Sequence, residues 1–93
     1  MNRNMDFEIR GIADLLASEN DPCKIRGFML EMFTKSELET LSKRWQIMKR
    51  LSNGQTQREI AKELKVSLCK VTRGAQILKD KKSVTGEYLK RGE

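Results

Sequence analysis

Two amphipathic helical patterns, separated by a short break, occupy residues 57–74, which read QREIAKELKVSLCKVTRG. The first pattern carries Ile60, Ala61 and Leu64 at helical spacing, and the break falls at Lys65-Val66. The second pattern places four apolar side chains on one face: Leu68, Val71, Ala75 and Leu78. This spacing is typical of a helix-turn-helix, whose second helix lies in the major groove of DNA. The spacing alone also fits an ordinary helical hairpin in an all-α domain.

Residues that favour helix starts precede both patterns. Thr56-Gln-Arg-Glu59 fits a capping box, in which each of the two end residues accepts a hydrogen bond from the backbone amide of the other. Ser67 is a favourable N-cap for the second helix. Ala61 is small enough for two helices to cross closely over a short turn. These local signals predict a helix on each side of the break.

Positive charge is concentrated in the part of the chain that carries the motif. Residues 1–33 have a net charge of −2, residues 34–93 a net charge of +8, and the whole chain a formal charge of +6. Lysine and arginine side chains that neutralise phosphates release counterions, which is the main source of non-specific affinity for DNA. A solvated basic face is the alternative, but the coincidence of charge and motif favours DNA binding.

Length and composition indicate one small, helical domain. The chain has 93 residues, of which 5% are aromatic and 34% are charged. A domain of this size buries a modest core, so oligomerisation is a plausible source of further stability. The apolar runs are too short to span a membrane, and the N-terminus lacks a secretory signal pattern, so we expect a cytoplasmic protein with no membrane partner.

No residue pattern in the chain predicts catalysis or metal binding. The sequence contains no histidine, and its two cysteines, Cys23 and Cys69, do not have the spacing of metal ligands. A glycine-rich phosphate loop and a paired acidic motif are also missing. We therefore predict a protein that is not an enzyme, with no metal site, no cofactor and two free thiols.

Further helices are predicted on both sides of the motif. The apolar spacing predicts helices over about residues 6–18 and 23–33, with Pro22 at the start of the second. Thr34-Lys-Ser-Glu37 is another capping box and opens a third helix, which we expect to end at Asn53-Gly54. Ser83 is positioned to cap a short last helix that reaches about Arg91.

One cation interrupts the apolar stripe of the third predicted helix. The stripe consists of Leu38, Leu41, Trp45, Met48 and Leu51. At about 100° per residue, Arg44 points into the middle of this stripe. One interpretation is that Arg44 extends to water or pairs with a carboxylate such as Glu31. The other is that Arg44 contacts an anionic ligand, because a buried cation needs a partner.

Several segments resemble the tryptophan repressor family. They are TQREIA (56–61), VTRGAQILK (71–79) and MFTKSELETLSKRWQIMKRLSNG (32–54), and the similarity extends from about Met29 to Lys79. The resemblance implies an all-α, six-helix fold that forms an intertwined homodimer. Residues 1–55 and 83–93 would form the dimer core, and residues 56–82 a helix-turn-helix head. It also implies L-tryptophan as a corepressor that binds between the core and each head.

The same resemblance assigns ligand-binding roles to matching positions. Arg44 and Arg73 would sandwich the indole ring, with one of them holding the carboxylate, and Thr34 would assist. Gly74 would leave room for the ligand. Three positions depart from the family pattern: Ile77 stands in place of a serine, and Glu31 and Phe33 stand in place of leucines.

The turn also departs from the family pattern. Lys65 occupies a position usually held by glycine, and one residue is missing between Gly54 and Gln57. These departures leave open whether the effector is tryptophan.

Candidate DNA contacts lie on both helices of the motif. Gln57 and Arg58 begin the first helix, and the arginine has the donors to read guanine through two hydrogen bonds. The candidates on the second helix are Leu68, Cys69, Lys70, Thr72, Arg73 and Lys79. We expect Lys70 and Thr72 to make phosphate or water-mediated contacts and Cys69 to lie near a thymine methyl. Non-specific phosphate contacts, with simple solvation as the alternative, are expected of Lys62, Lys65 and Lys79.

The sequence therefore predicts a ligand-dependent transcriptional repressor. It would bind double-stranded operator DNA as a homodimer when an amino-acid effector, L-tryptophan, is bound, and it would control tryptophan biosynthesis or uptake genes. One alternative is a regulator of the same fold with a different effector or none. The other, from a different class, is a helical protein-interaction module whose basic face binds an acidic partner.

Overall fold

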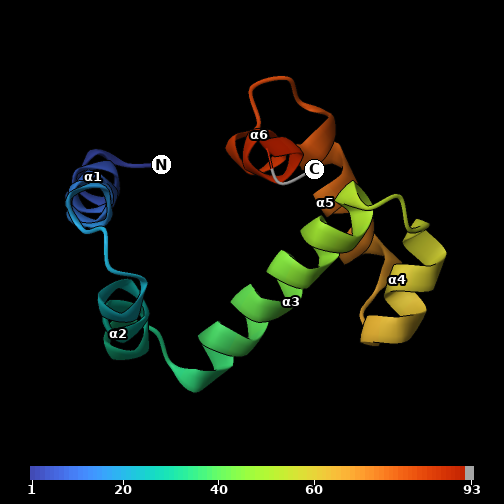
Figure 1. Ribbon diagram of the computed structural model, residues 1–93, viewed down its shortest axis with the longest axis horizontal. Helices are drawn as coiled ribbons and strands as arrows, with labels where there is room; N and C mark the ends of the chain where they lie inside the picture. The colour runs from blue at the N-terminus through green and yellow to red at the C-terminus, as the bar shows by residue number, and fades with distance from the viewer. Residues whose placement is uncertain (92–93) are drawn as a thin grey trace. The chain divides into compact units, whose positions relative to one another are not determined.

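The computed structural model describes residues 1–91, which form six α-helices and contain no strand (Figure 1). The helices are α1 (Arg3–Ser18), α2 (Pro22–Met32), α3 (Lys35–Ser52), α4 (Gln57–Leu64), α5 (Leu68–Lys79) and α6 (Val84–Arg91). The predicted all-α class with six helices is thereby confirmed. Positions 92 and 93, at the end of the predicted core segment 83–93, lie outside the described residues.

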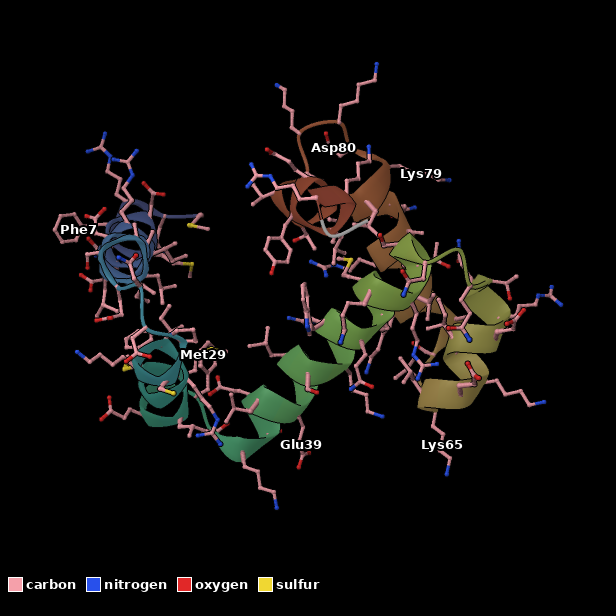
Figure 2. All side chains as sticks on the ribbon, viewed as in Figure 1. Phe7, Met29, Glu39, Lys65, Lys79 and Asp80 are labelled. Atoms are coloured by element: carbon pink, nitrogen blue, oxygen red, sulfur yellow. The ribbon has the colours of Figure 1, made fainter. Side chains whose placement is uncertain are left out.

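The chain divides into two compact units, Met1–Leu38 and Glu39–Glu93, and α1 lies in the first. The side chain of Asn2 accepts a 2.7 Å hydrogen bond from the amide of Met5 and caps this helix. Because of this cap, α1 begins at Arg3, three residues before the predicted start. Every residue of α1 is exposed, and Figure 2 shows Phe7 projecting away from the helix.

Capping residues also determine where α2 and α3 begin. Asp21 accepts a 2.9 Å bond from the amide of residue 23, and Pro22 occupies the first position of α2, where its missing N–H has no consequence. At α3, the Thr34 amide donates to Glu37 at 2.8 Å, and the Glu37 amide donates to the Thr34 hydroxyl at 3.1 Å. The capping box predicted at this position is thus complete.

A glycine terminates α3. Gly54 has a φ of 88°, and its amide donates to the carbonyl of Leu51 at 3.0 Å. The amide of Gln55 donates to the carbonyl of Arg50 at 3.1 Å. This pair of bonds is the Schellman arrangement, which requires a left-handed residue just after the helix. The predicted end of the third helix at Asn53-Gly54 is confirmed to within one residue.

The core of the second unit lies where α3, α4 and α5 meet. Its four buried apolar residues are Ile47, Ile60, Leu64 and Val71. Partly buried residues packed against them are Leu51, Ala61 and Val66. The small Ala61 of α4 is one of these residues and packs against the shared core.

The face that α3 buries in this core coincides with only one end of the predicted stripe, at Leu51. Trp45 is 41% exposed and Leu41 is 36% exposed, whereas Ile47 is 3% exposed. Ile47 lies about 200° around the helix from Trp45, because successive residues are separated by about 100°. The core therefore takes only the C-terminal end of the predicted stripe, where Leu51 packs beside Ile47, and the α4–α5 pair leaves the part around Trp45 uncovered.

Helix α6 packs against α5. The hydroxyl of Ser83 accepts a 2.9 Å bond from the amide of Gly86, in agreement with its predicted capping role. From α6, the ring of Tyr88 lies with its centroid 6.1 Å from that of Trp45 on α3. The last helix thus contacts the uncovered face of α3 as well as α5.

Candidate DNA-binding helix pair and ligand pocket

Helix α4 begins at a threonine cap and ends in a left-handed lysine. The hydroxyl of Thr56 accepts from the amide of Glu59 at 3.2 Å. The reciprocal bond from the Thr56 amide to the Glu59 carboxylate is not formed in the described part of the chain, so the predicted capping box is only half present.

Lys65 has φ 55° and ψ 47°, a conformation that costs a non-glycine residue roughly 1–2 kcal/mol. It is the only non-glycine residue with positive φ among residues 1–91. Figure 2 shows its side chain at the end of α4, pointing away from the ribbon. The strain is located in the turn between the two helices, at the position where the family pattern usually has glycine.

Helix α5 follows after a turn of three residues, Lys65 to Ser67. Ser67 caps α5 by accepting from the amide of Lys70 at 3.3 Å, as predicted. Ile60 of α4 and Val71 of α5 are completely buried, and this contact fixes the two helices against each other. The two predicted helices and the break between them are therefore present.

The first turn of α5 projects into solvent. Leu68, Cys69 and Lys70, three of the candidate DNA contacts, are all exposed, and Leu68 is thus not part of the core that Val71 enters. Further exposed candidates for DNA contact are Arg58, Lys62, Lys65, Arg73 and Lys79. Val71, one residue later, anchors the helix in the core. The N-terminal part of α5 is thus free of the core and accessible to a ligand as large as DNA.

Two predicted DNA contacts bind each other. The Thr72 hydroxyl donates to the side-chain oxygen of Gln57 at 2.8 Å, and both residues are half-buried. This bond joins the first residue of α4 to α5 and orients the Gln57 amide. Thr72 therefore has a structural partner within the pair, which sequence spacing did not reveal because the two residues are fifteen positions apart.

Two of the three candidate ligand residues of α5 lie at an open pocket of about 450 Å³ beside α6. Arg73 and Ile77 line it, together with Gln76, Asp80, Ser83, Val84 and Thr85. Asp80 was not among the predicted ligand residues, although it follows Ile77 by three positions and Arg73 by seven, which places all three on one helical face. The pocket therefore carries one cation and one carboxylate, separated by an aliphatic side chain.

Gly74 lies on the side of α5 that faces α3. It is buried, and a Cβ atom at this position would lie 3.0 Å from Cγ2 of Ile47 and 3.3 Å from Cδ1 of Leu51. The missing side chain therefore allows α5 to lie against α3. Arg44, the other predicted ring-stacking residue, is exposed on α3 and does not line the pocket.

The three remaining ligand candidates belong to the unit Met1–Leu38. Thr34 caps α3 through its hydroxyl, which accepts from the Glu37 amide. Glu31 and Phe33 are both exposed. Cys69 of α5 and Cys23 of α2 are free cysteines, and both are exposed.

Two other kinds of site are missing from the described residues. Among residues 1–91, no group of three or more potential metal ligands occurs. None of the helices in the same range is long and apolar enough to cross a membrane.

The comparisons with known proteins agree with the resemblance found in the sequence. The family model described as Trp repressor protein matches residues 8–93. Trp operon repressor homologs of Xylella fastidiosa strains M23 and Temecula1 are 35% identical to the chain over 81 residues, which cover 86% of this chain and 86% of each relative. No solved structure matches the chain. These matches favour a regulator over a protein-interaction module or an enzyme. The chain belongs to the Trp repressor protein family and is a trp-repressor-like transcription regulator.

Proposed function

We propose that the protein is a ligand-dependent repressor that binds operator DNA as a homodimer when L-tryptophan is bound. The observation that carries the proposal is the exposed first turn of α5, held by the buried Val71 immediately after it. A helix that protrudes in this way has the form required to enter the major groove. Such a repressor acts on DNA in the cytoplasm.

The proposed DNA contacts follow from the exposed charges of the pair. Arg58, near the start of α4, is exposed and carries the donors for bidentate recognition of guanine. Lys70 lies beside Cys69 on the exposed turn of α5, within reach of phosphate or water-mediated contacts. Gln57, whose oxygen is engaged by Thr72, would offer its amide nitrogen to a phosphate oxygen.

Uncovered apolar surface supports the homodimer. Phe7 of α1 is 73% exposed, Trp45 of α3 is 41% exposed and Tyr88 of α6 is 62% exposed. Large apolar side chains grouped on helix faces indicate an interaction surface. A second copy of the chain would cover these faces and supply the stability that a small core does not. Two heads in one dimer would then meet successive major grooves, which are about 34 Å apart.

The pocket beside α5 supports an amino-acid effector. Its volume of about 450 Å³ falls in the range of small-molecule sites. Arg73 offers a guanidinium to a carboxylate or an aromatic ring, and Arg44 would contact the ligand from α3. Ligand bound preferentially to the DNA-competent arrangement of the heads would shift the population toward that arrangement.

A specific observation favours a second candidate, a regulator of this family with a different effector. Ile77 forms part of the pocket wall and has no group that hydrogen-bonds an ammonium. Glu31 and Phe33 are the further positions that differ from the family pattern. An effector that carries an aliphatic group in place of indole would fit such a wall.

Two measurements test the proposal in sequence. A mobility shift with random duplex DNA at low salt is expected to show binding, since phosphate contacts do not depend on base sequence. If no binding occurs, the repressor proposal fails, and the alternative of a helical protein-interaction module is favoured instead. Isothermal titration with L-tryptophan is then expected to show binding that Arg73→Ala abolishes.

Arg58→Ala is the matched control for the titration. It removes an exposed arginine from α4 and is expected to weaken DNA binding while leaving tryptophan binding unchanged. If millimolar tryptophan gives no heat and another amino acid raises the melting temperature, the second candidate replaces the first.

A further inference from the structure

We propose that Lys43 is a positioning residue for DNA binding, which fastens α4 to α3 and so sets the orientation of the α4–α5 pair. The proposal rests on the proposed DNA-binding function. The positive charge of Lys43 would by itself suggest a contact with a DNA phosphate, whereas the proposed role is to hold α4 in place.

The decisive contact is a hydrogen bond between two helices. The Nζ atom of Lys43 on α3 donates to the backbone carbonyl of Leu64 at 2.8 Å. Leu64 is the last residue of α4, and the last carbonyls of a helix have no partner within the helix. The negative end of the helix dipole lies there too, so an ammonium group stabilises this terminus.

The left-handed turn is the reason that this carbonyl needs an external donor. The amides of Lys65 and Val66 both turn back to the carbonyl of Ala61. The carbonyl of Leu64 is not used by these two amides, and it accepts the hydrogen bond from Nζ of Lys43. The bond is partly shielded from water, and its donor carries a full charge, which makes it stronger than a neutral bond.

A second polar contact joins the same two helices. Arg50 of α3 pairs with Glu63 of α4 through Nη1 and Oε2 at 2.9 Å. The side chain of Gln55, in the turn between the helices, also donates to Oε2 of Glu63. The Arg50 and Glu63 side chains are 37% and 53% exposed, so water screens their attraction. The Lys43 side chain is also exposed, but its bond ends on the carbonyl of Leu64, a buried residue, so the bond is the better shielded of the two contacts.

The other end of α4 is attached to α5. Gln57, the first residue of α4, accepts the hydrogen bond from Thr72 of α5. Helix α4 is thus bound to α3 at its C-terminal end and to α5 at its N-terminal end, with Ile60 and Leu64 packed in the core between them. If the C-terminal attachment is removed, α4 tilts, and the exposed turn of α5 is displaced with it.

A positioning lysine and a phosphate-binding lysine differ in their response to salt. Removal of a phosphate-binding lysine reduces the slope of log K against log salt by about 0.9 for each phosphate that is no longer neutralised. Removal of a positioning residue lowers the affinity at every salt concentration and leaves the slope unchanged, because the number of released counterions is the same.

The first experiment measures amide hydrogen exchange in the free full-length protein. Lys43→Met is expected to speed exchange in α4 by about tenfold, the effect expected of removing one charge-assisted bond. Exchange in α6 should stay as in the wild type, and Lys43→Arg, which keeps a cationic donor, should restore protection of α4. Unchanged exchange in α4, or an equal increase in α4 and α6, would overturn the proposal, since the latter indicates general instability.

The second experiment measures binding to a random-sequence DNA duplex over a range of salt concentrations. Lys43→Met should bind several-fold more weakly with the wild-type slope, whereas Lys70→Met should show a reduced slope. Lys49→Met is the matched control, because it removes one charge from the same helix at a side chain that lies over the Trp45 ring.

Wild-type affinity in Lys43→Met, or a slope reduced as in Lys70→Met, would overturn the positioning role. If the wild-type protein itself does not bind DNA, the proposed function fails. The exchange result would then still decide whether Lys43 holds α4.

Discussion

The two units of the chain differ in how they bury apolar side chains. The unit Glu39–Glu93 contains Ile60 and Val71, which are completely buried, and a core that three helices share. The unit Met1–Leu38 contains no buried residue, although α1 carries Ile9, Ile12 and Leu16 at helical spacing. The comparison teaches that an apolar stripe at helical spacing does not by itself tell whether the chain buries that stripe. The apolar faces of α4 and α5 are buried by residues of the same chain, whereas the apolar face of α1 is exposed to solvent.

The largest effect is expected from the core of the second unit. Ile60→Ala should lower the free energy of unfolding by about 2–5 kcal/mol, because it leaves a cavity where α4 and α5 meet. Urea denaturation at a fixed protein concentration measures this decrease. A change below about 1 kcal/mol would mean that the pair is not held by its own core, and the contrast between the units would disappear.

A charge on the apolar face of α1 tests the other side of the comparison. If a second copy covers this face, Ile12→Glu should raise the dimer dissociation constant roughly ten- to hundredfold, because a carboxylate would be buried without a partner. Sedimentation equilibrium measures the constant. Ala17→Glu is the control, since it adds the same charge about 140° around the helix. Equal effects of the two variants would argue against a dimer contact through this face.

The same glycine substitution is expected to have opposite effects in the two units. Gly11→Ala should stabilise the protein by about 0.5–1 kcal/mol, since alanine favours a helix and a Cβ at this position has open space. Gly74→Ala should give no such stabilisation and should lower the free energy of unfolding, because the added Cβ would lie 3.0 Å from Cγ2 of Ile47. Thermal denaturation compares the two. If Gly11→Ala destabilises the protein, a neighbouring chain lies closer to α1 than its open surface suggests.

The smallest effect in free energy concerns the surface of the pair. Lys70→Met should reduce the salt slope of DNA binding by about one for each phosphate that the lysine neutralises in the wild type. The folded state should keep its stability, because Lys70 is exposed and its side chain contributes nothing to the core. Binding isotherms over a range of salt concentrations measure the slope. If the slope does not change, Lys70 is removed from the phosphate contacts, and the exposed turn of α5 meets DNA by other residues.

Local structure was predictable where short-range chemistry decides it. Thr34 and Ser67 cap helices through bonds to amides three residues away, and Gly54 ends α3 by adopting a positive φ. Lys65 is left-handed because the turn requires it, whatever side chain the sequence supplies there. The family resemblance was also readable from contiguous residues. Caps and turns of this kind depend on residues a few positions apart in the chain, so the residue types and their spacing can be recognised in the sequence.

Features that depend on distant neighbours were not predictable. The predicted stripe on α3 includes Trp45 and Leu51, but only the packing of α4 and α5 decides that Ile47 and Leu51 are covered and Trp45 is not. The bond between Thr72 and Gln57 spans fifteen positions, and the bond from Lys43 to the Leu64 carbonyl spans twenty-one. No periodicity encodes either bond, since each exists only after the helices have docked.

The sequence by itself determined the six helices, the caps at Thr34, Ser67 and Ser83, the break between α4 and α5, and the family. The tertiary structure decided which apolar face is buried, that Gly74 serves the contact with α3, and that Asp80 joins Arg73 and Ile77 at one pocket. The physical reason is the range of the forces involved. Capping and helical periodicity act within a few residues, whereas burial and polar contacts between helices depend on which surfaces meet in space.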